Sequence, residues 1–201
     1  MSTELYRRLG IEPGVTAVIG SGGKTTLLAK LCEELPGRVI LCTSTRIYPF
    51  DLPLITERVE TLPFDKVCMG IPAEQGKLSA PVQSFAELAG LADYVLVEAD
   101  GSRHLPFKAH LSHEPVIPAC ARQTIQVVGT WALGGPVSEA VHRPERFMEL
   151  SGCAMDDAVT PENLAKVLNT ENLAHLVLLN GPENPELQNL LRIPYITQSV
   201  Q

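Results

Sequence analysis

VTAVIGSGGKTTLLAKL, residues 15–31, places an apolar run before a glycine-rich turn and an amphipathic pattern after it. The run at 15–19 has the composition of a buried strand, and the leucines that follow have the spacing of one helix face. A strand, a glycine-rich loop and a helix in this order are typical of a phosphate-binding loop. The residues predicted to form that loop and bind the cofactor are Gly20, Ser21, Gly22, Gly23, Lys24, Thr25 and Thr26.

The residue types in this loop suit the chemistry of a bound triphosphate. Glycines allow backbone N–H groups to converge on a phosphate without a clash from Cβ atoms, and a helix N-terminus adds partial positive charge. Lys24 is predicted to contact the β- and γ-phosphates, and the Thr25 hydroxyl to bind Mg²⁺. The cofactors predicted are therefore Mg²⁺ and either ATP or GTP. The alternative is a glycine-rich turn of some other α/β fold.

The match to the usual phosphate-loop pattern is imperfect. Val18 stands where that pattern has its first glycine. The resulting sequence, GSGGKTT, is similar to the GTNGKTT-like loop of Mur-type ligases as much as to a standard Walker A loop. A Mur-like ligase, or a kinase that passes the γ-phosphate to a small molecule, therefore stays open as an alternative.

The composition of the chain indicates which classes of protein and of partner to expect. The chain has 201 residues, of which 45% are hydrophobic and 19% charged, which is enough for one sizeable core and predicts a single domain over 1–201. The net charge is −7 and no run of lysine or arginine is present, so we expect neither nucleic acid nor a membrane as a partner. The first ten residues lack the apolar core of a signal peptide, and we expect a cytoplasmic protein. The five cysteines form no C-x-x-C pair, which disfavours a zinc knuckle.

Apolar runs alternate with helical patterns along the chain. An irregular, proline-rich span interrupts them at 48–81. The predicted strands cover 15–19, 39–42, 66–70, 94–97, 125–129 and 176–179. The predicted helices cover 24–35, 84–92, 161–168 (with Thr160 as its N-cap) and 185–191. This order predicts an α/β fold: a P-loop-type, doubly wound, mainly parallel sheet with flanking helices. Ligands of such folds bind at the carboxyl ends of the strands.

Two of those strand ends carry polar residues that suit Mg²⁺ and phosphate. The strand at 94–97 ends in Glu98 and Asp100, carboxylates that are predicted to organise Mg²⁺. The loop after 39–42 contains Thr45, a predicted metal ligand, and Arg46, which is predicted to neutralise developing phosphate charge. Lys24, Glu98, Asp100 and Arg46 are thus the predicted catalytic residues. The alternatives are solvated carboxylates and a turn whose hydroxyls bond to nearby backbone.

Two further polar segments are candidates for binding a substrate. One, at 101–118, has prolines that argue against a helix; the other, at 142–145, follows a Gly-Gly-Pro turn. The residues that they offer are Arg103, Lys108, His113, Glu114, His142 and Arg143. Their cations suit a phosphate or an acidic substrate. Isolated histidines are more often structural, and that alternative stays open.

Several of these segments together resemble one family, YqeC. The resemblance lies in VIGSGGKTTLL, TSTRI, VEADGSRHLPFKAHLSHEPVIP, VHRPE and VTPENLAKVL, and it extends from about residue 14 to 180. Members are described as accessory proteins of selenium-dependent molybdenum hydroxylases. The resemblance implies a P-loop NTPase-like protein whose partners are a molybdenum hydroxylase or its cofactor-assembly proteins.

The sequence departs from the family at the end of the strand at 176–179. Relatives tend to have an N-K-x-D-like sequence there, which reads guanine in GTPases. This chain keeps Asn180, a predicted cofactor contact, but has Gly181 in place of the lysine and Glu183 in the acidic place. The choice between ATP and GTP therefore stays open.

Three functions are compatible with these residues. The first is a Mg²⁺-dependent nucleoside triphosphatase that helps selenium-dependent molybdenum hydroxylases to mature. The second is the Mur-like ligase or small-molecule kinase. The third is a non-catalytic partner that senses nucleotide.

Overall fold

The computed structural model describes residues 4–200, and the chain in it forms two compact units. Unit 1 contains residues 4–18, Thr25–Gly101 and Val116–Thr124. Unit 2 contains Ile19–Lys24, Ser102–Pro115 and residues 125–200. The phosphate loop and the start of the helix after it thus divide between the two units at the peptide bond that joins Lys24 to Thr25.

Unit 1 is built on a parallel sheet. Its strands lie in the order β1-β7-β2-β4-β3, and each neighbouring pair is parallel. Their bounds are β1 (Gly14–Gly20, of which 14–18 pair with β7), β2 (Val39–Thr43), β3 (Leu54–Ile55), β4 (Lys66–Met69) and β7 (Tyr94–Glu98). In this register Thr43 and Val18 are both partners of Glu98, so β2 and β7 end level with one another, beside Val18 of β1.

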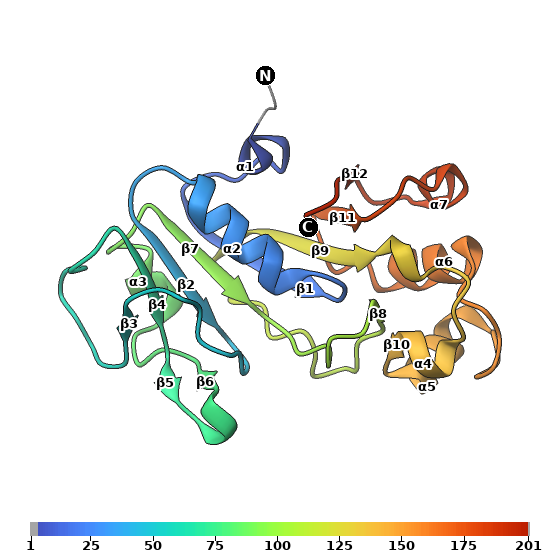
Figure 1. The fold of residues 1–201 in the computed structure, drawn as a ribbon, viewed down its shortest axis with the longest axis horizontal. Helices are drawn as coiled ribbons and strands as arrows, with labels where there is room; N and C mark the ends of the chain where they lie inside the picture. Colours follow the sequence, from blue (N-terminus) through green and yellow to red (C-terminus); the bar gives the residue numbers. More distant parts are fainter. Residues whose placement is uncertain (1–3, 201) are drawn as a thin grey trace. The chain divides into compact units, whose positions relative to one another are not determined.

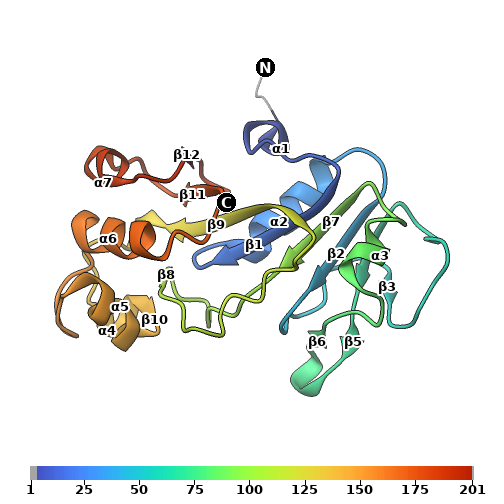
Figure 2. The ribbon, with the colours of Figure 1, turned by 180° about the vertical axis from the view of Figure 1, so that it is seen from behind.

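Helices lie on both faces of this sheet (Figures 1 and 2). α2 (Lys24–Glu34) is in front of the strands in Figure 1, whereas α3 (Phe85–Leu88) is in front in Figure 2. The strands β2 and β7 are buried along their whole length, as near-continuous apolar runs covered on both faces should be. One face packs Val15, Ile40, Val67 and Val95 into a core with Leu88 of α3. The short α1 (Leu5–Arg8) precedes the sheet.

The span expected to be irregular has more structure than the sequence indicates. Besides β3 and β4 it contains the antiparallel pair β5 (Ile71–Pro72) and β6 (Leu78–Ser79), joined by the 3-10 turn η1 (Glu74–Gly76). Strands of two residues are too short to show any hydrophobic alternation, which is why the sequence pattern misses them.

Unit 2 contains a second set of parallel strands in the order β12-β11-β9. A separate parallel pair, β8 with β10, places His142 opposite Lys108. The strands are β8 (Phe107–Lys108), β9 (Ala121–Gly129, in this unit from residue 125), β10 (Val141–His142), β11 (Leu176–Asn180) and β12 (Tyr195–Thr197). The helices are η2 (Thr130–Ala132), α4 (Val137–Ala140), α5 (Pro144–Ser151), α6 (Pro161–Glu171) and α7 (Pro185–Leu190).

The core of unit 2 forms between its strands and helices. Phe147 of α5, Leu164 and Leu168 of α6 and Leu187 of α7 pack with Val177 of β11. α6 begins at the threonine and proline predicted from the sequence, because Thr160 caps it and exchanges side-chain bonds with Asn163.

The structure confirms an α/β fold with mainly parallel strands and flanking helices. Most predicted elements are present, with ends that differ from the predicted ones by at most four residues. The expected helix at 84–92 is wrong beyond residue 88, where turns replace it, and the strand expected at 125–129 starts at Ala121. All five cysteines are free thiols. Within 4–200, no helix combines the length and the apolar character needed to cross a membrane.

Candidate functional site

The predicted phosphate loop lies between the end of β1 at Gly20 and the start of α2 at Lys24. Ser21 anchors it twice: its N–H donates to the Val127 carbonyl over 2.9 Å, and its hydroxyl donates to the Leu105 carbonyl. These bonds hold the loop against two other segments of unit 2. The loop therefore has a fixed path before any ligand binds.

Three glycines are required by the path of the loop: Gly20, Gly22 and Gly23 all have positive φ and no room for a Cβ. Gly22 has φ +82°, and a Cβ added there would lie 2.6 Å from the Gly129 nitrogen and 2.8 Å from the Pro106 carbonyl oxygen. Gly23 has φ +124°, and a Cβ there would overlap the Asn180 side-chain amide. Only glycine adopts such φ values without strain, and only glycine fits these contacts. The loop is thus packed against the backbone that surrounds it.

Lys24 lies inside the curve of this loop. Its side chain is buried (3% exposed), and Nζ donates to the Gly20 carbonyl over 2.7 Å and to the Ser102 hydroxyl over 3.1 Å. The ammonium group is therefore held at the mouth of the helix N-terminus, where positive potential is already concentrated. Ser102 was not among the predicted site residues. It lies four residues after Glu98, the last residue of β7, and this closeness to the acidic strand end is the signal that would have indicated it.

Asn180, predicted to contact the cofactor, supports the loop in this structure. Its side-chain amide donates to the Gly22 carbonyl over 2.8 Å, and its side-chain oxygen accepts from the Val200 N–H over 3.0 Å. The residue is 2% exposed. Both ends of the carboxamide are thus used to join the phosphate loop to the end of β11 and to the segment near residue 200. A direct contact with the cofactor stays a prediction.

The predicted metal ligands Thr25, Thr45 and Glu98 lie together in unit 1. The Thr25 hydroxyl is 3.5 Å from a Glu98 carboxylate oxygen, and Glu98 is 8% exposed. Thr43 donates to the Glu98 carbonyl over 2.8 Å, and its hydroxyl is 3.3 Å from that of Thr45. Parallel register brings the ends of β2 and β7 to one level and so places Thr43 and Thr45 near Glu98, whereas Thr25 comes from the first turn of α2.

The donors in this group suit Mg²⁺. All are hard oxygens, and Mg²⁺ in nucleotide sites is usually held by one or two carboxylates and by phosphate and water oxygens. Within residues 4–200, no group of three or more His, Cys, Asp and Glu side chains is placed to hold a metal ion by itself. Asp100 is buried two residues beyond Glu98, while Arg46 and Thr26 are exposed. Thr25 and Glu98 would therefore need the phosphates of a ligand to complete the coordination.

Four of the predicted substrate residues form one charged cluster in unit 2. Glu114 accepts from Arg143 over 2.9 Å and lies 3.4 Å from the Lys108 ammonium nitrogen. The pairing of β8 with β10 adds His142 beside Lys108. Partial burial favours the neutral form of Glu114, but the Arg143 hydrogen bond and both cations outweigh it and lower its pKa to about 2. His113 lies exposed, outside the ion pairs of this cluster.

His142 is held neutral by its surroundings. Burial lowers its pKa to about 4, with contributions from the positive charges of Lys108 and Arg143 and a smaller one from Arg103. A histidine whose pKa is lower in the folded state loses stability as pH falls below its unfolded value of about 6.5. The lowered pKa of Glu114 also makes the protein less stable as pH falls, but this loss begins only below about pH 4.5. The difference in stability between the wild type and a variant without His142, measured between pH 7 and 5, therefore reports on His142.

We expect His142→Gln to remove part of the acid sensitivity of the fold. Between pH 7 and 5 the wild type should lose about 1–2 kcal/mol of unfolding free energy that the variant keeps. Urea unfolding at both pH values measures this difference. The matched control is His113→Gln at an exposed position, which should follow the wild type. Parallel pH dependence of His142→Gln and wild type would contradict the lowered pKa.

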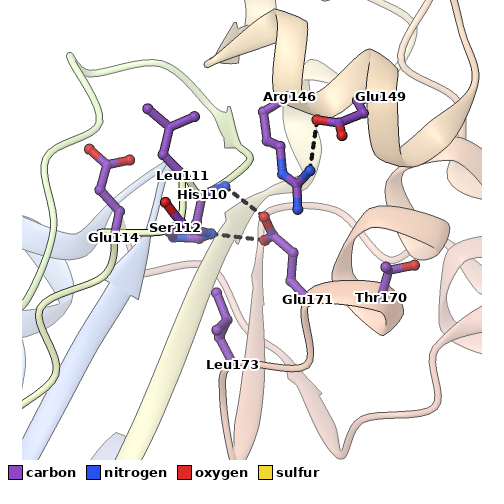
Figure 3. Close-up of a pocket in the computed structure, with 9 residues that line it drawn as sticks. All are labelled: His110, Leu111, Ser112, Glu114, Arg146, Glu149, Thr170, Glu171 and Leu173. Atoms are coloured by element: carbon purple, nitrogen blue, oxygen red, sulfur yellow. Dashed lines mark hydrogen bonds and ion pairs between the residues drawn. The ribbon is translucent and has the colours of Figure 1, made fainter.

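A pocket of about 540 Å³ lies beside this cluster and includes Glu114 in its wall (Figure 3). His110 and Glu171 face one another in it: His110 donates its backbone N–H over 2.6 Å, and its Nδ1 lies 2.8 Å from the carboxylate. Arg146 and Glu149 form a second pair at 2.7 Å. Nothing in the sequence indicated Glu171, because it lies 61 residues from His110 and belongs to an ordinary helical pattern.

Comparison with known proteins agrees with the motifs quoted above. The family model described as YqeC protein matches residues 16–145. A protein of Escherichia coli (strain K12) named "Uncharacterized protein YqeC" is 34% identical over 178 residues, covering 78% of this chain and 68% of that protein. No solved structure matches the chain significantly. The matched region contains the phosphate loop, the Glu98 strand end and the charged cluster, and the chain belongs to the YqeC family.

Proposed function

We propose that this protein is a Mg²⁺-dependent nucleoside triphosphatase that acts as an accessory protein in the maturation of selenium-dependent molybdenum hydroxylases. The observation that carries the nucleotide part is the loop at 20–24, with its buried lysine and three glycines at positive φ. The pathway rests on the family resemblance alone. A molybdenum hydroxylase, or a protein that assembles its cofactor, would be the macromolecular partner.

The contacts of Lys24 support the binding of a triphosphate. Its ammonium group already lies at the helix N-terminus, bonded to the neutral oxygens of Gly20 and Ser102. A phosphate oxygen would accept a hydrogen bond from this ammonium group, and a bond between an ionised donor and an ionised acceptor is short and strong. The loop would therefore bind phosphate without rebuilding its backbone.

The grouping of Thr25 and Glu98 supports the role of Mg²⁺. The Thr25 hydroxyl and the Glu98 carboxylate offer hard oxygen donors, the kind that hold Mg²⁺ in nucleotide sites. Bound Mg²⁺ would neutralise phosphate charge during hydrolysis. Glu98 would hold that ion or its water ligands, while Arg46 and Asp100 keep their predicted catalytic roles as part of this proposal.

Glu98→Gln is expected to weaken the Mg²⁺ dependence of nucleotide hydrolysis. The amide is nearly isosteric but has no charge, so about tenfold more Mg²⁺ should be needed for half-maximal turnover, which corresponds to about 1.4 kcal/mol. Phosphate release measured over a Mg²⁺ titration at saturating nucleotide gives this value.

The control for that titration is Glu87→Gln. Glu87 belongs to unit 1 as well, but it is exposed at the start of α3, where it completes the capping box with Ser84. Its loss should lower stability slightly and leave the Mg²⁺ midpoint unchanged. Identical Mg²⁺ curves for Glu98→Gln and wild type would assign Glu98 a purely structural role.

A second candidate function is supported by the pocket of about 540 Å³ in unit 2. A Mur-like ligase or a small-molecule kinase needs an acceptor site, and this pocket has Glu114, His110 and Arg146 in its wall. Product analysis separates the candidates. Free phosphate as the sole product supports the triphosphatase, whereas a phosphorylated or ligated product supports transfer. Binding without turnover supports a nucleotide-sensing partner.

A further inference from the structure

The single tryptophan of the chain stands half-exposed in a pocket of unit 2. Trp131 belongs to η2, directly after β9, and 47% of it is exposed. It lines a pocket of about 550 Å³ together with Asn180, Gly181, Pro182 and Ser199. A large aromatic side chain that stays accessible inside a concave site offers its surface to a flat ligand.

The indole ring of Trp131 packs against the backbone of Gly129 and Gly181. A Cβ on Gly129 would lie 2.6 Å from Cη2 of the indole, and one on Gly181 would lie 3.6 Å from Cε3. The Thr130 hydroxyl donates to the Pro182 carbonyl over 2.9 Å, which ties η2 to the loop after β11. Two walls of the pocket are therefore joined to each other before a ligand arrives.

The same residues connect this pocket to the phosphate loop. Asn180 lines the pocket and donates to the Gly22 carbonyl. Gly22 packs on Gly129, and Gly129 packs on the indole of Trp131. Asn180 thus both lines this pocket and contacts the phosphate loop. A second pocket of about 390 Å³ also borders Trp131, but neither Asn180 nor a loop residue lines it.

We propose that Trp131 is the stacking platform for the purine base of the bound nucleoside triphosphate. The proposal rests on the proposed function and adds the residue that holds the base. Stacking on an aromatic side chain tolerates any base, because every base has a π-face. The triphosphate would occupy the loop at 20–24, and the base would enter the pocket at Trp131.

The residues that line the pocket imply weak selectivity between adenine and guanine. Gly181 and Pro182 offer no side-chain donor, and both ends of the Asn180 amide are used within the protein. Ser199 supplies one hydroxyl, and the exposed Glu183 is not among the lining residues. Strong base selectivity needs buried partners that the wrong base leaves unpaired. We expect the affinities for ATP and GTP to differ by less than about tenfold, or about 1.4 kcal/mol.

Because Trp131 is the sole tryptophan, its fluorescence tests the proposal directly. Wild-type protein is titrated with Mg-ATP, Mg-GTP and Mg-tripolyphosphate, and the same titrations are followed by calorimetry. ATP and GTP should change the emission at the concentrations where they bind. Tripolyphosphate has no base and should bind without an equal change in emission.

Three variants complete the experiment. Trp131→Ala should weaken ATP and GTP binding about five- to hundredfold while leaving the tripolyphosphate affinity within about twofold. Trp131→Phe keeps an aromatic ring and should retain most of the affinity. Tyr195→Ala, at another exposed aromatic residue of unit 2 that does not line the pocket, should bind like the wild type.

The possible failures are distinguishable. If nucleotides bind but neither the emission nor the Trp131→Ala affinity changes, the stacking proposal is overturned and the proposed function stands. The stacking proposal is also overturned if Trp131→Ala weakens tripolyphosphate and nucleotide binding equally, because the residue then only supports the loop. If wild type binds neither nucleotide nor tripolyphosphate, the proposed function fails and the stacking proposal fails with it.

Discussion

Lys24→Ala is expected to weaken the binding of Mg-ATP and Mg-GTP at least hundredfold while the fold survives. The lysine is the only side-chain cation of the loop, and it would form hydrogen bonds with two phosphates. Hydrogen bonds to charged groups are each worth about 1.5–3 kcal/mol, so losing two of them costs about 3 kcal/mol or more. That loss corresponds to a factor above about one hundred in the dissociation constant.

The fold should tolerate this change because the hydrogen bonds of Lys24 lie within the loop and its immediate surroundings, not in the hydrophobic core. Its Nζ bonds to Gly20 and Ser102 offset the cost of removing its charge from water, and alanine removes both the bonds and that cost. Calorimetry measures the affinity, and circular dichroism with a thermal melt checks folding. Lys30→Ala, in the same helix but outside the loop, is the matched control. Undiminished nucleotide affinity in folded Lys24→Ala would refute the phosphate-loop assignment.

Gly22→Ala is expected to lower stability and to remove triphosphate binding together. Left-handed backbone costs a residue with a Cβ about 1–2 kcal/mol. The new methyl would also press on the Gly129 nitrogen and the Pro106 carbonyl, two backbone groups that are hydrogen-bonded to each other at 3.1 Å. Overpacking of this kind adds about 1–3 kcal/mol, for a total loss of about 3 kcal/mol in unfolding free energy.

Gly134→Ala separates the cost of backbone strain from the cost of overpacking. Gly134 has a similar φ of +89°, but nothing lies within 4 Å of a Cβ placed there. It should therefore lose only about 1–2 kcal/mol and bind nucleotide normally. Urea unfolding and calorimetry on both variants give the comparison. Equal destabilisation of the two would show that backbone strain alone acts at Gly22, and normal binding by Gly22→Ala would show that the loop path does not matter.

The phosphate-loop segment was predicted closely because its signals are local. An apolar run, glycines and a leucine pattern follow one another over residues 15–35, and the observed β1 and α2 end within one residue of the predicted positions. The position of Glu98 at a strand tip was also predictable, because the buried run at 94–97 is continuous. Parallel pairing of β2 with β7 then places Glu98 opposite Thr43. The Thr25 hydroxyl, at the start of α2, lies 3.5 Å from the Glu98 carboxylate.

The sequence predicted which residues belong to the charged cluster in unit 2, but it did not predict the contacts among them. Glu114 and Arg143 are 29 positions apart in the chain, and they meet where β8 pairs with β10. Those strands have two residues each, so no periodicity indicates them. The sequence therefore offered cations for a substrate, whereas the structure shows Lys108 and Arg143 already neutralising Glu114.

Patterns among neighbouring residues were enough to establish the α/β class, the strand–loop–helix at 15–35 and the acidic strand end, and long, specific motifs established membership of the YqeC family. Three contacts became visible only once the chain was folded: Asn180 holds the phosphate loop, Glu171 pairs with His110, and Trp131 stands in a pocket beside Gly129. Each of them depends on chain segments brought together by sheet register and core packing. Such contacts leave no trace in local composition, because the free energy that selects them comes from burial across the whole unit.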